Sequence, residues 1–167
     1  MEAVYIPQLT ASPEQTQLIQ VQEVLPGLET LTPIRGRIQV QHHGNYLEVS
    51  AQAETIITLT CHRCLQQYNH RLPLDTSEII WLEETSSQLN EGPLERELAF
   101  EDLVETCLAS GYFYPSEWLY EQLCLAIPQR QLCDVQCTGI QMTTQAGSVQ
   151  SVDKRWASLE ALKKQLP

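Results

Sequence analysis

The chain has 167 residues, of which 43% are hydrophobic, which suits one domain with a packed core. Its mean hydropathy of -0.23 and the lack of a long apolar run argue against a membrane span. The formal net charge of -11 argues against a duplex-binding protein, which normally shows a basic face. The first residues lack a basic region followed by an apolar stretch, so we expect an intracellular protein whose cysteines stay reduced.

The acidic excess is concentrated between Asp75 and Glu105. This stretch holds ten acidic residues and one base, Arg96, so it carries -9 of the total charge of -11. A surface of this kind favours a basic protein partner. The alternative is ordinary solvation of a loop and a helix face.

Residues 34–61 give the clearest structural signal. Apolar and polar residues alternate along 34–42 and again along 47–61, which predicts two strands with one buried face each. His43-Gly44-Asn45 between them is typical of a hairpin turn. Gly36 indicates a bulge or a close backbone approach. The apolar residues from Leu18 to Leu25 fit either a strand or a short helix.

The later elements predict a mixture of strands and helices. We expect strands over 67–72 and 76–82 with a break at Pro73, then an exposed loop over 84–96. Apolar spacing predicts helices over 100–108 and from Pro115 to Pro128. The predicted fold is α+β, with a curved, barrel-like antiparallel sheet and helices packed after it. We expect one domain over 1–137, a flexible linker over 138–151 and a C-terminal helix over 152–167.

Four of the six cysteines form two close pairs, Cys61 with Cys64 and Cys133 with Cys137. Four thiols in two pairs can close a tetrahedral site, for which zinc is the usual metal, and such a site would join the sheet to the segment after the helices. Two alternatives remain open, a cluster of buried thiols without metal and a redox or disulfide pair. The redox alternative is weakened because a strand, not a helix, follows Cys64. Cys107 and Cys124 fit apolar packing.

No catalytic motif is present, so we expect a protein that is not an enzyme and has no small-molecule substrate. A modest basic cluster surrounds the first cysteine pair. It comprises Arg35, Arg37, Arg63 and Arg71 together with His62 and His70, and its four arginines are the candidate contacts to a partner or to RNA. The alternative is a solvated sheet face.

Three segments resemble the YceD family, the large ribosomal RNA subunit accumulation proteins of bacteria and plastids. They are the C-x-R-C-L motif at Cys61, the run from Gln122 to Ile140 that includes the second pair, and Asp153-Lys154-Arg155-Trp156. The Gln-rich sequence is most similar to the cyanobacterial and plastid branch. Unlike many bacterial members, the chain has no further cysteine pair, so any metal must be held by the four paired thiols.

The resemblance implies a factor for accumulation or processing of large-subunit ribosomal RNA. Its expected partners are a ribosomal protein or the precursor RNA, with no membrane association. The expected location is the cytoplasm, or the plastid stroma in a plant. The alternative function is a thiol-based redox or metal-responsive regulator.

Overall fold

A computed structural model describes residues 1–84 and 105–140 of the chain. The described part is mostly β-sheet with few helices, as the α+β prediction requires. In chain order its elements are β1 (Val4–Tyr5), α1 (Ile6–Leu9), the short 3-10 helix η1 (Pro13–Gln15), β2 (Thr16–Glu23), β3 (Ile34–His42), β4 (Tyr46–Thr60), β5 (Gln67–Glu83), β6 (Thr106–Leu108), β7 (Tyr112–Phe113) and α2 (Pro115–Ala126).

The main sheet has five strands in the order β2-β3-β4-β5-β6, and β1 pairs with β7 separately. Neighbouring strands from β2 to β5 are antiparallel, whereas β6 is parallel to β5. The sheet is therefore mixed, which corrects the prediction of a purely antiparallel one. It is also not closed, because β2 and β6 are its two edges, and the barrel-like shape is not confirmed.

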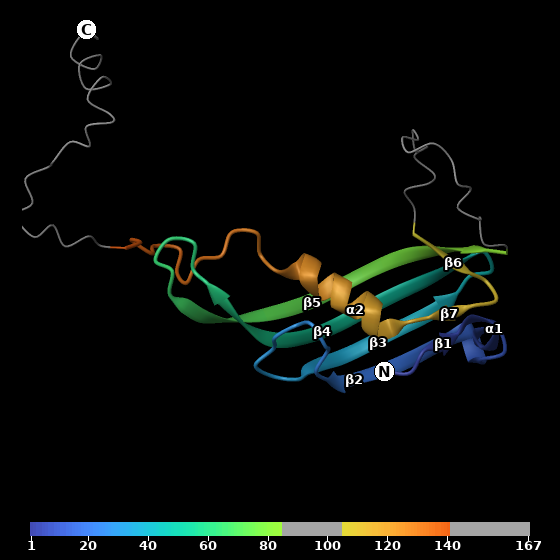
Figure 1. The fold of residues 1–167 in the computed structure, drawn as a ribbon. Coiled ribbons are helices and arrows are strands. Elements are labelled where there is room, and N and C mark those ends of the chain that lie inside the picture. The colour runs from blue at the N-terminus through green and yellow to red at the C-terminus, as the bar shows by residue number, and fades with distance from the viewer. Residues whose placement is uncertain (85–104, 141–167) are drawn as a thin grey trace, which may run out of the picture.

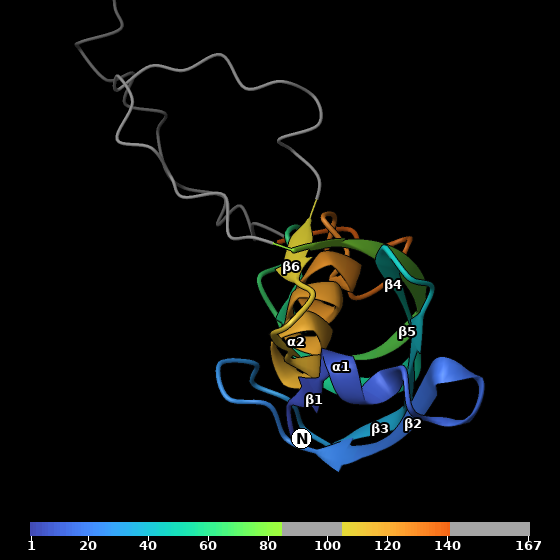
Figure 2. The same cartoon turned by 90° about the vertical axis from the view of Figure 1, so that its right-hand side faces the viewer.

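Helix α2 lies along the concave side of the long, curved sheet (Figures 1 and 2). Alternate residues of β3 and β4 point to this side and are buried, as the period-two pattern predicts. Trp118, Leu119 and Leu123 of α2 complete the core, each at most 3% exposed. Proline in its first turn fits a helix start, and the helix ends just before Pro128.

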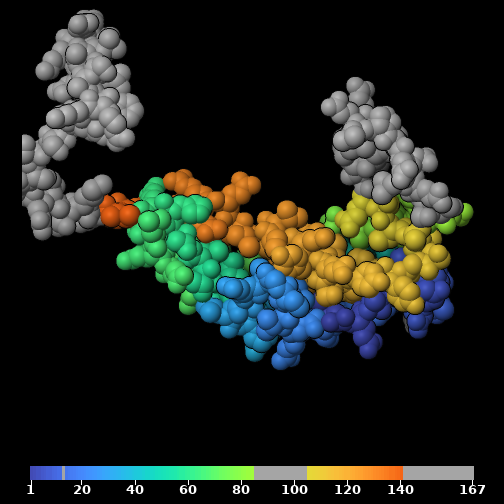
Figure 3. All heavy atoms as spheres, viewed as in Figure 1, coloured from blue at the N-terminus to red at the C-terminus, as the bar shows by residue number. Residues whose placement is uncertain are grey.

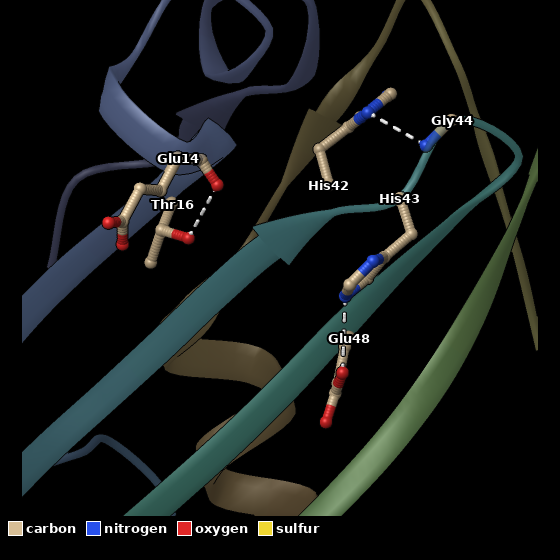
Figure 4. Close-up of polar contacts among 6 residues, drawn as sticks. All are labelled: Glu14, Thr16, His42, His43, Gly44 and Glu48. Carbon is tan, nitrogen blue, oxygen red and sulfur yellow. Dashed lines mark hydrogen bonds and ion pairs between the residues drawn. The ribbon is translucent and has the colours of Figure 1, made fainter.

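The β3–β4 hairpin confirms the predicted turn. Gly44 has a φ of +90°, a conformation that glycine adopts without strain. Its N–H donates to Nδ1 of His42, and His43 contacts Glu48 on the neighbouring strand (Figure 4). The same close-up shows the turn before β2, where the Thr16 hydroxyl donates to the carbonyl oxygen of Glu14.

Strands β3 and β4 approach each other so closely at position 36 that only glycine fits there. It lies opposite Ala53 in an unbroken β3–β4 register, so there is no bulge. A Cβ atom on Gly36 would overlap the carbonyl oxygen of Gln52 and lie 2.5 Å from Cα of Ala53. Of the two readings that the sequence allowed, close backbone approach is the right one.

Two predictions about element boundaries are wrong. Pro73 does not break a strand, since β5 runs unbroken from Gln67 to Glu83. Beside Pro73 only β4 pairs with β5, because β6 joins at Trp81–Glu83, and proline is tolerated in a strand with one unpaired side. Residues 106–108 form β6 instead of the end of a helix, because they pair with β5.

Several predicted segments lie outside the described residues. They are residues 85–96 of the predicted loop, residues 100–104 of the predicted helix, residues 141–151 of the linker and the C-terminal helix at 152–167. Among the described helices, none is long and apolar enough to cross a membrane.

Candidate metal centre

Both cysteine pairs meet at one end of the sheet. The sulfur atoms of Cys61, Cys64, Cys133 and Cys137 all lie within 4.8 Å of one another. Cys61 directly follows β4, and the second pair belongs to the segment after α2. The prediction that the two pairs come together is confirmed.

A tight turn brings the first pair together. The N–H of Leu65 donates to the carbonyl oxygen of Cys61, and the N–H of Cys61 donates to Gln66, both at 2.9 Å. Leu65 has a φ of +61°, which is uncommon for a residue other than glycine. The N–H of Arg63 points at the Cys61 sulfur, 3.4 Å away. The turn thus directs both sulfurs, and one backbone donor, toward a common point.

The second pair has one more residue between its cysteines, and Asp134 organises it. The side-chain carboxylate of Asp134 accepts a hydrogen bond from the N–H of Gln136 at 2.7 Å. The backbone carbonyl oxygen of Asp134 accepts one from the N–H of Cys137 at 3.1 Å. This is the local side-chain-to-backbone turn that Asp favours. The longer spacing therefore still brings both sulfurs to the site.

Hydrogen bonds also hold the two turns to each other. The Arg63 guanidinium donates to the carbonyl oxygen of Cys137 at 2.9 Å and to that of Val135 at 3.5 Å. The N–H of His62 donates to the carbonyl oxygen of Gln131 at 2.8 Å, and the N–H of Gln131 points back at Nδ1 of His62. Sequence reasoning missed these linking roles, and the only sequence signal for them is the position of His62 and Arg63 between two thiols.

The size of the sulfur cluster fits a tetrahedral metal site. With Zn–S bonds of about 2.3 Å, the sulfur atoms of a regular tetrahedron lie ~3.8 Å apart. Cys61 and Cys137 are 3.9 Å apart, and Cys64 and Cys133 are 3.7 Å apart, measured between sulfur atoms. All six cysteines are free thiols. Four thiols at these separations suit zinc in geometry and in ligand type.

Two of the four thiols have strongly shifted pKa values, in opposite directions. Backbone N–H groups of Cys133 and Cys64 lower the pKa of Cys61 to about 6. Hydrogen bonds that the Cys133 thiol shares as donor with the side chains of Cys137 and Cys64 favour its protonated form and raise the pKa of Cys133 to about 12. Cys61 therefore releases its proton readily, whereas Cys133 keeps its proton, since like charges repel at short range. A divalent cation at the centre would remove this repulsion.

Burial decreases across the site. Cys61 is fully buried beneath the turn, Cys64 and Cys137 are half-buried, and Cys133 is exposed. Leu65, which follows the first pair, and Val135, which lies within the second, are 64% and 86% exposed. With four protein ligands no position would be left for water or substrate, which is the arrangement of structural zinc sites.

The four predicted basic contact residues do not form one cluster. Arg35 and Arg37 of β3 and Arg71 of β5 are exposed on the convex face of the sheet. Arg71 is paired with Glu54, and Arg37 donates to the side chain of Gln52. Arg63 lies apart from them at the thiol site. The convex face therefore mixes both signs of charge.

The comparisons with known proteins identify one family. Residues 49–163 match the family described as large ribosomal RNA subunit accumulation protein YceD. Neither a curated protein nor a solved structure matches the chain. The matched range covers most of the sequence, including both cysteine pairs. The chain therefore belongs to the YceD family of large ribosomal RNA subunit accumulation proteins.

Proposed function

We propose that this chain is a non-enzymatic factor for the accumulation of large-subunit ribosomal RNA. Family membership is the observation that carries the proposal, because the family description names that RNA. The chain would act by binding a ribosomal protein or the precursor RNA during assembly. Its place of action would be where ribosomes are assembled, the cytoplasm or, in the plastid branch, the stroma.

We further propose that Cys61, Cys64, Cys133 and Cys137 hold a structural zinc ion. The supporting observations are the sulfur separations and the two turns that aim the sulfurs inward. When bound, zinc would cross-link the β4–β5 turn to the segment that follows α2. The chain's own residues would then present fixed surfaces to a partner, with no step of chemistry at the metal.

Exposed arginines on the convex face support a contact with a partner. Arg35 and Arg37 flank Gly36 on β3, and Arg71 lies two strands away on β5. Nearby acidic side chains, such as Glu54 and Asp75, offset their charge. A few arginines in this setting suit individual contacts to phosphate or to carboxylates.

The proposal is tested in cells that lack the protein and are complemented with variants. Mature large-subunit RNA and its precursors are quantified, and association of the protein with assembling particles is followed on sucrose gradients at low salt. Wild-type protein should restore the mature RNA and sediment with large-subunit particles. Normal RNA levels in cells without the protein, with no co-sedimentation, would contradict the proposal.

A second candidate function is a thiol-based or metal-responsive regulator. The observation that favours it is the exposed position of Cys133, whose sulfur lies 3.7 Å from that of Cys64. This function predicts rapid, reversible alkylation of the thiols in the folded protein. A structural zinc site predicts slow alkylation that accelerates when a chelator is added.

A further inference from the structure

A groove lies between α2 and the loop that follows β2. Its volume is about 430 Å³, and its lining combines apolar and acidic side chains, namely Leu25, Pro26, Ser116, Glu117, Tyr120 and Glu121. In the space-filling view the blue loop lies against the orange surface of α2 (Figure 3). Gly27 turns the loop with a φ of +87°, and a Cβ there would lie 3.4 Å from the Tyr120 ring.

Among the described residues, the charged side of this groove has no basic partner. Glu117 and Glu121 are exposed and, being four residues apart, lie on the same face of α2. Within residues 1–84 and 105–140, no lysine or arginine forms an ion pair with either carboxylate. Like charges at this spacing destabilise a helix slightly, so a cation between them would relieve the repulsion.

Neighbouring carboxylates extend the negative surface. Burial and the nearby charges of Glu78 and Glu121 raise the pKa of Glu105, so Glu105 lies within electrostatic reach of both. Glu78 is already engaged, because it accepts hydrogen bonds from Trp118 Nε1 at 2.6 Å and Gln122 Nε2 at 2.8 Å. Glu117 and Glu121 are thus the carboxylates available to a partner.

We propose that this groove binds a basic segment of a partner protein. A lysine or arginine head group would lie between Glu117 and Glu121, and its aliphatic stem would pack on Leu25, Pro26 and the Tyr120 ring. The inference rests on the proposed function and narrows its partner class to a basic protein. Phosphates of an RNA would be repelled by the same carboxylates.

The test uses the full-length protein and a short fluorescein-labelled peptide rich in arginine, lysine and leucine. Binding is measured by fluorescence anisotropy at low and moderate salt. In the double variant Glu117→Gln, Glu121→Gln we expect the affinity to fall about fivefold, since exposed ion pairs are individually weak. We also expect the wild-type affinity to fall as salt rises.

A matched control separates the groove from bulk charge. The double variant Glu48→Gln, Asp75→Asn removes the same charge from exposed positions on the other face of the sheet. It should bind the peptide within about twofold of wild type, because neither residue lines the groove and salt screens exposed charges. Equal losses in both double variants would overturn the proposal, as would tighter binding of a labelled RNA oligonucleotide than of the peptide.

Two further measurements complete the test. Neutralising Lys163 and Lys164 should leave peptide affinity unchanged, whereas a marked gain would assign the groove to the chain's own tail and overturn the proposal. Thermal unfolding should show that the groove variant is folded. The cell assay keeps the two proposals distinguishable: intact RNA accumulation with no peptide binding would overturn the groove proposal alone.

Discussion

The Arg63 side chain donates a hydrogen bond to the carbonyl oxygen of Cys137, at a distance of 2.9 Å. The two residues are 74 positions apart, so this contact fixes the second cysteine turn against the first. Gly139, two residues after Cys137, has a φ of +80°, and a Cβ atom at this position would lie 3.3 Å from the carbonyl oxygen of Arg63. The thiol site is therefore held by its surroundings as well as by any metal.

Replacing Arg63 should loosen the site without unfolding the sheet. We expect Arg63→Gln to lose about 1 kcal/mol of stability and to release zinc to a chelator several-fold faster, because one charged donor to the second turn is lost. Chelator competition with a zinc-sensitive dye measures the release. Arg71→Gln is the matched control, since Arg71 is exposed and pairs with Glu54 away from the site. Equal release from both variants would refute the role of Arg63.

Gly36→Ala should destabilise the sheet strongly. The new methyl group would overlap the backbone of β4, so the two strands must separate, at a cost of about 3 kcal/mol. Denaturant unfolding measures the loss. Gly44→Asn is the control, because nothing lies within 4 Å of that position and asparagine tolerates a positive φ. If Gly36→Ala lost less unfolding free energy than Gly44→Asn, the two strands would not approach closely in solution.

Glu105→Gln should stabilise the protein at neutral pH. The folded state raises the pKa of Glu105, through burial first and then through the charges of Glu78 and Glu121. Folding therefore favours the protonated form, and stability falls as the pH rises through this raised pKa. The gain in melting temperature should be clear at neutral pH and small at about pH 4, where the raised pKa keeps Glu105 protonated in the folded state. A variant that melts lower than wild type at neutral pH would contradict this sign.

Local patterns were sufficient for much of the fold. The alternation along β3 and β4 and the turn at Gly44 depend on residues close in sequence, and they were predicted correctly. The end of the predicted 100–108 helix was not, because Cys107 and Leu108 fit either a helix stripe or a strand. Pairing with Leu82 and Glu83 decides for the strand, and no sequence pattern records that contact.

The thiol site could be predicted only in part, because some of its contacts join residues that are far apart in sequence. The close spacing within each cysteine pair is a local signal, and two such pairs suggest one shared tetrahedral site, so the meeting of Cys61 with Cys137 could be anticipated although they are 76 positions apart. The hydrogen bond between His62 and Gln131 joins residues far apart in sequence, and the position of His62 between two thiols does not identify its partner. The groove was also missed, because Leu25 and Tyr120 come together only through the folded position of α2.

Zinc content is the measurement that tests the central claim most directly. Freshly purified wild-type protein should contain about one zinc ion per chain, and the double variant Cys61→Ser, Cys64→Ser should contain none and unfold at a lower temperature. Cys107→Ser is the control, since Cys107 lies outside the sulfur cluster and should leave the zinc content unchanged. Wild-type protein without bound metal, equal in stability to the double variant, would contradict the account.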